Sequence, residues 1–235
     1  MGSIFKFKQF EVDQCGCAMK INTDGVLLGA VATHPAPFHI LDIGTGTGVI
    51  ALMLAQRFTQ AVVDAVEIDV SAAEAAGANF AASPFADRTA AHPVAFEKYD
   101  AAMKYDLIVS NPPYFINDLK SQEKRKEVAR HTHVDFFDLM LRKAVNMLTE
   151  NGLIWLILPV AQAEKVVVNA VLHQLQPVKI IHIYSDRTKT AFRQIIALGF
   201  NAAKPLVHEH VYIYEAKDLY TDQYKQLLSD FFLAF

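Results

Sequence analysis

The sequence predicts an α/β fold built on a doubly wound, mostly parallel sheet. Short apolar runs alternate with helix-like stretches from residue 38 to about residue 200, an order typical of strand–helix–strand units. A glycine-rich turn over residues 44–48 follows one apolar run and opens a helix-like stretch, and the next apolar run ends in Glu67. These features are typical of a Rossmann-like domain whose ligand lies at the carboxyl ends of the strands.

The core elements can be placed along the chain from their apolar patterns. Strands are predicted over residues 39–43, 61–66, 106–110, 153–158 and 178–183, and helices over residues 48–57, 71–82 and 135–148. Two more strand-like runs, 193–200 and 208–214, follow one another closely. We therefore expect the sheet to end in antiparallel strands, with a closing helix over residues 219–232.

A short extension precedes this core. Apolar and polar residues alternate from Phe5 to Phe10, as in a half-exposed strand. Thr23 or Asp24 is the predicted N-cap of a small-residue helix that follows. We therefore expect an N-terminal extension over residues 1–37 and a main domain over residues 38–235.

Composition limits the class of protein. With 235 residues, 52% of them apolar, the chain suits one domain with a sizeable core. It has neither an apolar run long enough for a membrane helix nor a secretory signal, so we expect a cytoplasmic protein without a membrane partner. Cys15 and Cys17 are too close for an ordinary disulfide and too few for a zinc site, which favours reduced thiols and no metal. Nothing in the sequence indicates an obligate protein partner.

The glycine-rich turn is the candidate cofactor site. Its candidate residues are Asp42, Gly44, Gly46 and Gly48. Glycines there permit a tight turn at a helix N-terminus, which favours an anionic group. That group could be the pyrophosphate of a dinucleotide or the carboxylate of the methionine part of S-adenosylmethionine. Glu67 can accept hydrogen bonds from ribose hydroxyls, which both ligands share, and a nucleotide-free domain with a structural glycine turn also stays open.

The segment after the strand 106–110 favours one chemistry. It reads Asn111-Pro112-Pro113-Tyr114, and these four residues are the candidate catalytic group. An aromatic amine is a weak nucleophile whose nitrogen gains positive charge as it attacks a methyl group. The Asn111 side-chain oxygen and the Pro112 carbonyl can accept its hydrogens, the prolines fix the backbone, and Tyr114 offers a stacking face. In isolation this motif is more typical of a structural turn, but after the glycine turn and Glu67 it favours methylation of an amine, with Asn111 facing the cofactor.

These residues resemble class I S-adenosylmethionine-dependent methyltransferases that modify amines, and more closely the bacterial tRNA-valine adenine-N6 methyltransferase family. The resemblance rests on residues 7–10, 17–21, 23–30, 52–57, 83–84 and 106–114. It implies a seven-stranded sheet with an antiparallel last strand, S-adenosylmethionine as cofactor with S-adenosylhomocysteine as product, and no metal. It also implies tRNA as partner and the adenosine just 3′ of the anticodon, position 37, as the methylated base.

Candidate substrate-binding residues come from three segments. They are Lys20, Thr23 and Asp24 in the extension, Tyr114 and Phe115 in the catalytic turn, and Lys124, Arg125, Lys126 and Arg130 in the polar stretch 117–133, which we expect to be flexible. A net charge of −3 is not typical of a nucleic-acid-binding protein, so contact with RNA must come from such local patches. The basic run is equally typical of a solvated loop.

One position departs from the family pattern. Family members usually carry an acidic residue after the third strand to bind the cofactor's adenine amine, and alignment places Ala95 there, followed by Phe96. Glu97 or Asp100 could substitute, or Phe96 could stack on the adenine.

Three other functions stay open: a methyltransferase for another RNA, a protein glutamine-N5 methyltransferase, and a nucleotide-binding module without turnover. The second usually has a larger helical N-terminal domain than the 37 residues found here.

Overall fold

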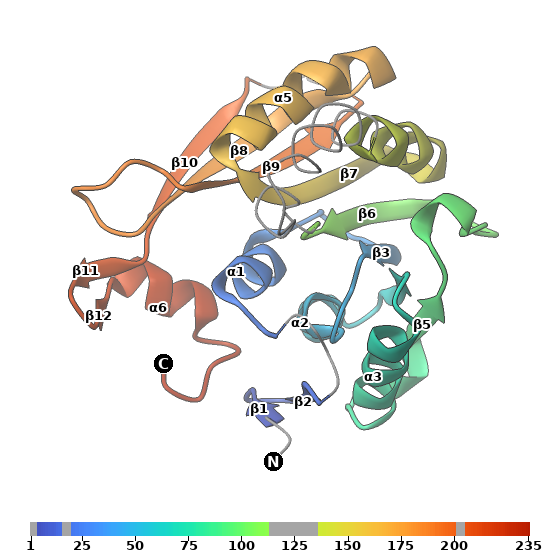
Figure 1. The fold of residues 1–235 in the computed structure, drawn as a ribbon, viewed down its shortest axis with the longest axis horizontal. Helices are drawn as coiled ribbons and strands as arrows, with labels where there is room; N and C mark the ends of the chain where they lie inside the picture. Colours follow the sequence, from blue (N-terminus) through green and yellow to red (C-terminus); the bar gives the residue numbers. More distant parts are fainter. Residues whose placement is uncertain (1–3, 16–19, 113–135, 201–204) are drawn as a thin grey trace, which may run out of the picture.

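The computed structural model describes residues 4–15, 20–112, 136–200 and 205–235, and their centre is a twisted eight-stranded sheet (Figure 1). The strands are β3 (His39–Ile43), β4 (Val62–Glu67), β5 (Thr89–Pro93), β6 (Tyr105–Ser110), β7 (Leu148–Pro159), β8 (Gln176–Tyr184), β9 (Arg193–Gly199) and β10 (Val207–Tyr212). Their order is β10-β8-β9-β7-β6-β3-β4-β5, and only β9 runs antiparallel to its neighbours. The predicted doubly wound α/β fold is confirmed.

Helices cover both faces of the sheet. They are α1 (Thr23–Val31), α2 (Val49–Arg57), α3 (Val70–Ala81), α5 (Val160–Ala170) and α6 (Asp222–Leu228), the helix 136–147, and the short 3₁₀ helices η1 (Ala86–Arg88), η2 (Phe96–Lys98) and η3 (Val171–His173). Two small hairpins complete the fold, β1 (Ile4–Lys6) with β2 (Glu11–Asp13), and β11 (Tyr214–Ala216) with β12 (Leu219–Tyr220). None of the helices in the described ranges is long and apolar enough to cross a bilayer.

Both faces of the sheet are buried, which explains why its central strands are mostly apolar instead of alternating apolar and polar residues. On β7, Trp155 and Ile157 join the core formed with α1, α2, α3 and α6, whereas Ile154, Leu156 and Leu158 join the core formed with α5 and the helix 136–147. Figure 1 shows these two groups of helices on opposite sides of the sheet. The apolar pattern therefore located the strands without revealing which face each residue occupies.

The last part of the sheet differs from the expected seven strands. β9 is antiparallel to β7 and β8, but the following strand, β10, pairs with β8 in parallel instead of continuing the antiparallel order. Both edges of β9 are already paired, with β7 and β8, so β10 cannot pair with the strand that precedes it and joins the outer edge of β8. The closing helix is also shorter than predicted, because Leu219 and Tyr220 form β12 and Thr221 caps α6, its side chain accepting from the Tyr224 N–H at 3.1 Å. β5 and α5 were not predicted.

The N-terminal extension is part of the core. Phe7, Phe10 and Val12 are buried, and the predicted strand is a hairpin, β1–β2. The N-cap of α1 is Asn22, which accepts from the Gly25 N–H at 2.9 Å, and not Thr23 or Asp24 as predicted. The division into an extension and a main domain stays a prediction, since the two share one core.

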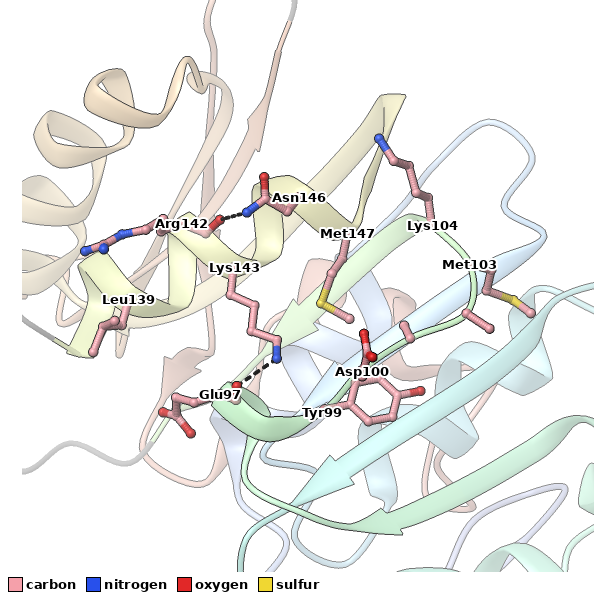
Figure 2. A pocket seen from close by; sticks show the side chains of 12 residues that line it. Glu97, Tyr99, Asp100, Met103, Lys104, Leu139, Arg142, Lys143, Asn146 and Met147 are labelled. Carbon is pink, nitrogen blue, oxygen red and sulfur yellow. Dashed lines mark hydrogen bonds between the residues drawn. The ribbon is translucent and has the colours of Figure 1, made fainter.

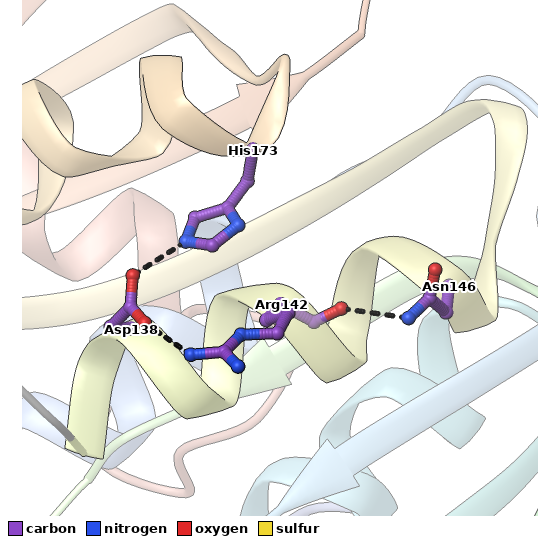
Figure 3. A network of polar contacts seen from close by, with 4 residues as sticks. All are labelled: Asp138, Arg142, Asn146 and His173. Atoms are coloured by element: carbon purple, nitrogen blue, oxygen red, sulfur yellow. Dashed lines mark hydrogen bonds and ion pairs between the residues drawn. The ribbon is translucent and has the colours of Figure 1, made fainter.

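A polar network joins the helix 136–147 to η3, which follows α5 (Figure 3). Asp138 binds His173 Nε2 at 2.8 Å through one oxygen and Arg142 Nη2 at 2.6 Å through the other. The hydrogen bonds from Arg142 and then from His173 lower the pKa of the Asp138 carboxyl. This network holds the start of the helix that follows residues 113–135, which lie outside the described part of the chain.

Candidate active site

The predicted cofactor and catalytic segments meet at one edge of the sheet. β3 lies between β4 and β6, so the glycine turn after β3, Glu67 at the end of β4 and Asn111 after β6 are neighbours. The strand order reverses at β3, which is the position where open α/β sheets bind ligands. The buried Ser110 donates from Oγ to the Ile43 carbonyl at 2.7 Å and joins the ends of β6 and β3. The predicted proximity of the two motifs is confirmed.

The glycine turn forms a cradle over which a ligand can lie. Gly44, Gly46 and Gly48 have φ of 73°, 56° and 83°, values that favour glycine. A Cβ at Gly44 or Gly46 would meet no described heavy atom within 4 Å, so both positions face open space. At Gly48 a Cβ would lie 2.5 Å from Phe80 Cε1, so this glycine permits close packing of α3 on the turn.

Glu67 bridges the turn and the start of α3. Its Oε2 accepts from the Gly46 N–H at 2.9 Å and its Oε1 from the Asp69 N–H at 3.0 Å. The N–H groups of Gly44 and Thr45 donate to the Val66 carbonyl at 2.8 and 3.2 Å. These amides are therefore hydrogen-bonded within the protein, and they fix the turn to the end of β4. A ribose could still use the remaining lone pairs of the half-buried Glu67 carboxylate.

Asp42 supports the turn from beneath. It is fully buried, and its Oδ2 accepts from Thr45 Oγ1 at 2.6 Å. Burial raises the pKa of Asp42 to about 7, the neighbouring charge of Glu67 adding a smaller upward effect and the Thr45 bond opposing it. The assignment of Asp42 to the cofactor site stays a prediction, because the structure places its carboxyl under the turn without an exposed surface.

The raised pKa of Asp42 predicts a pH-dependent stability. The native state holds this proton more tightly than the unfolded chain, whose carboxyl has its ordinary pKa of 3.8, so the free energy of unfolding should fall as pH rises from about 4 to about 7. The whole effect is on the order of 4 kcal/mol. Asp42→Asn should be more stable than the wild type above pH 7 and similar to it near pH 4 in urea titrations without ligand. The exposed Asp87→Asn is the control, and parallel wild-type and Asp42→Asn curves would contradict the prediction.

The catalytic turn is described as far as Pro112. Asn111 is half-buried and Pro112 is buried at the end of β6. Asn111 Nδ2 lies 3.8 Å from where a Cβ of Gly25 would be, so the start of α1 lies against the Asn111 amide. The other predicted members, Pro113, Tyr114, Phe115, Lys124, Arg125, Lys126 and Arg130, lie outside the described residues.

The substrate residues predicted in the extension have different surroundings. Lys20 and Thr23 are exposed, whereas Asp24 is buried and forms an ion pair with Arg193 Nε at 2.8 Å. Arg193 was not among the predicted site residues. The two partners are 169 positions apart, and no local pattern in the sequence links them.

A second residue whose role was not predicted joins the extension to the glycine turn. The buried Asn79 of α3 donates from Nδ2 to the carbonyls of Thr47 at 2.9 Å and Asp13 at 3.0 Å, and its Oδ1 accepts from the Asp13 N–H at 2.9 Å. An Asn within a helix, where this residue type is disfavoured, was the only signal of such a role.

The unusual Ala95 position lies just after β5. Ala95 precedes η2, and Phe96 is only 8% exposed, packed in the core with Lys143 Nζ 5.6 Å from its ring centroid. The alternative in which Phe96 stacks on the cofactor's adenine therefore finds no support. Glu97 and Asp100 line a cavity of about 690 Å³ beside the helix 136–147, where Lys143 donates to the Glu97 carbonyl at 2.9 Å (Figure 2).

The site fits S-adenosylmethionine better than a metal. The open cradle over Gly44 and Gly46 beside an acidic residue suits an amino-acid and ribose moiety. Within the described ranges there is no group of three His, Cys, Asp or Glu side chains that could hold a metal ion.

Comparison with known proteins agrees with this geometry. The family described as "Methyltransferase small domain" matches residues 21–184. Proteins named tRNA1(Val) (adenine(37)-N6)-methyltransferase from Pedobacter heparinus and Christiangramia forsetii are 55% and 39% identical, with alignments covering 100% and 97% of both chains. A crystal structure of a predicted O-methyltransferase from Agrobacterium tumefaciens superposes with a TM-score of 0.67 at 17% identity, covering 88% of this chain and 96% of that one, which shows the shared fold. The chain belongs to the methyltransferase small domain family, together with these tRNA1(Val) (adenine(37)-N6)-methyltransferases.

Proposed function

We propose that this protein transfers a methyl group from S-adenosylmethionine to the exocyclic N6 amine of an adenosine in tRNA, namely adenosine 37 of a valine tRNA. The observation that carries the proposal is the placement of Asn111 beside the glycine turn, joined to it through the bond from Ser110 to Ile43. The names of the full-length relatives support the choice of substrate.

The chain's own residues provide two functions in this reaction. When bound, S-adenosylmethionine supplies an electrophilic methyl group. The cradle over Gly44 and Gly46 holds the methionine part, and Glu67 accepts hydrogen bonds from the ribose. Asn111 Oδ1 and the Pro112 carbonyl accept the hydrogens of the adenine amine and stabilise the positive charge that develops on its nitrogen.

No strong base is needed for this step. The amine proton becomes acidic only as the new N–C bond forms, and it then passes to solvent water. The two fixed acceptors therefore need only hold the amine hydrogens and stabilise the charge. Ser110 and the buried Pro112 on either side hold Asn111 in place, which limits the reorganisation needed in the transition state. Tyr114 is proposed from the sequence to stack on the base, and Lys124, Arg125, Lys126 and Arg130 to contact the RNA backbone.

The function can be tested with tritiated S-adenosylmethionine and total tRNA from a strain that lacks this protein. Nucleoside mass spectrometry should find N6-methyladenosine, and sequencing of the labelled tRNA should place it at position 37 of a valine tRNA. Label in another RNA, or on a protein glutamine, would replace the proposal by one of its alternatives.

We also propose a cytoplasmic location, without a membrane or an obligate protein partner.

Glu67→Ala is expected to weaken S-adenosylmethionine binding by about 1–3 kcal/mol, because charge-assisted bonds to the ribose and the bond to Gly46 are lost. Calorimetric titration measures this change. Glu74→Ala, an exposed acid on α3, is the matched control and should bind normally. Unchanged affinity in Glu67→Ala would remove this residue from the cofactor site.

A further inference from the structure

A cleft of about 470 Å³ lies between the start of α1 and the turn that joins β8 to β9. Thr23 and Asp24 line one side, and Ser185, Phe192, Arg193 and Tyr214 line the other. β8 runs in the same direction as β6, so this turn and Asn111 are at the same edge of the sheet. A Cβ built on Gly25, the residue after Asp24, would lie 3.8 Å from Asn111 Nδ2, so the start of α1 links this cleft to the candidate catalytic turn.

The Asp24–Arg193 ion pair forms the polar part of this cleft. The side chains of Arg193 and Asp24 are 25% and 11% exposed, and their atoms are 2.8 Å apart. Arg193 also donates from Nη1 to the Phe192 carbonyl at 3.1 Å, and its Cζ lies 5.3 Å from the Phe192 ring centroid. The pair therefore holds the Phe192 ring in place, although 37% of this residue stays exposed.

Tyr214, on the same side of the cleft as Phe192, is also held in place by neighbouring residues. Tyr214 stacks on Tyr220 with ring centroids 5.0 Å apart and an angle of 21°, and Tyr220 stacks on the buried Tyr224 at 5.0 Å and 19°. The Tyr214 N–H donates to the Ser185 carbonyl at 2.8 Å. Two anchored rings thus line a space of the size that small-molecule groups occupy.

We propose that this cleft binds an unpaired nucleobase next to the methylated adenosine in the same RNA loop. The proposal rests on the proposed function and names a second contact of the same site. The charges of Asp24 and Arg193 cancel, so the cleft offers no net positive charge to hold a phosphate, whereas its aromatic rings suit a base. RNA loops present splayed bases that stack on aromatic side chains, and the exposed Thr23 in the wall of the cleft has a hydroxyl that can form a hydrogen bond with a base edge.

The test combines a protein variant with an RNA series. A tRNA stem–loop is prepared with each loop nucleotide in turn, except the methylated one, replaced by an abasic nucleotide. Phe192→Ala should raise KM for the intact stem–loop roughly 5- to 150-fold, the range expected for loss of one stacked base, with little change in kcat. One abasic substitution should raise KM similarly in the wild type but have no further effect in Phe192→Ala, because both changes remove the same contact.

Two controls separate stacking from structural effects. Phe38→Ala removes a Phe that is 64% exposed at the start of β3, on the opposite edge of the sheet, and should leave KM unchanged. Phe192→Tyr keeps a ring and should restore the wild-type KM and the response to the abasic series. Independent, multiplying effects of Phe192→Ala and every abasic substitution, or an equal loss in Phe38→Ala, would overturn the inference.

Failure of the proposed function can be told apart from failure of this inference. A stem–loop with 2-aminopurine at the identified flanking position should change fluorescence on binding to the wild type but not to Phe192→Ala, with or without turnover. If this change occurs and no methyl group reaches adenine, the cleft binds RNA and the proposed activity is wrong. If adenine is methylated and the fluorescence is unaffected by Phe192→Ala, the inference about the cleft is wrong.

Discussion

Asn111→Ala is expected to lower kcat for RNA methylation by about 100- to 1,000-fold, in line with the loss of one preorganised group that stabilises transition-state charge. Asn111 acts on positive charge that appears only as the amine attacks, so its removal should reduce kcat and leave the dissociation constant of S-adenosylmethionine nearly unchanged. Single-turnover rates and calorimetry on the same preparation measure the two quantities separately.

Two conservative changes sharpen this test. Asn111→Asp still accepts from the amine and should keep partial activity, because its carboxylate retains the oxygen at that position. Ser110→Ala removes the bond to the Ile43 carbonyl and should reduce kcat less than Asn111→Ala, since the backbone pairing of β6 with β3 remains. Wild-type rates in Asn111→Ala would show that the amine is held elsewhere and that the mechanism is wrong.

Gly48→Ala is expected to destabilise the protein by about 2–5 kcal/mol. The φ of 83° at Gly48 disfavours any residue with a Cβ by about 1–2 kcal/mol. The new methyl group would also lie 2.5 Å from Phe80 Cε1, and such overpacking typically costs about 1–3 kcal/mol. Urea denaturation measures the sum, and weaker binding of S-adenosylmethionine should accompany it because the turn shapes the cofactor cradle.

Gly77→Ala is the matched control for this change. Gly77 lies within α3, where a Cβ would approach only Ala91 Cβ at 3.9 Å, so alanine should be neutral or stabilising there. Adding Phe80→Leu to Gly48→Ala should recover part of the loss by relieving the clash while the backbone strain remains. A Gly48→Ala protein as stable as the wild type would show that the turn relaxes freely.

The local sequence was sufficient for the fold class and for the two central motifs. β3, β4 and β6 contribute side chains to the cores on both faces of the sheet, so each appears as a mostly apolar run that a single aspartate interrupts, and the glycine turn follows β3 directly. Asn111 follows β6 in the same way. Because the carboxyl ends of parallel strands lie at one edge of the sheet, the proximity of the glycine turn and Asn111 could be predicted without the structure.

Elements with weak local patterns were missed. β5 reads Thr-Ala-Ala-His-Pro, with a single β-branched residue, and α5 contains Val166-Val167-Val168, a run that disfavours a helix. Their structure comes from packing: β5 pairs with β4 and contacts α3, and α5 covers β7 and β9. In these segments tertiary contacts outweigh intrinsic propensity.

Pairings between distant segments could be decided only by the folded chain. β10 pairs with β8 and not with the preceding strand β9, both edges of which are already paired, and the residues of β10 do not by themselves indicate this partner. Arg193 meets Asp24 across 169 positions, and Asn79 reaches both Asp13 and Thr47. Periodicity and turn chemistry are local properties that a short window of sequence contains, whereas the partner of a side chain depends on which surfaces the whole chain brings together. The candidate catalytic turn could therefore be predicted from the sequence, whereas the cleft beside it could be found only in the folded structure.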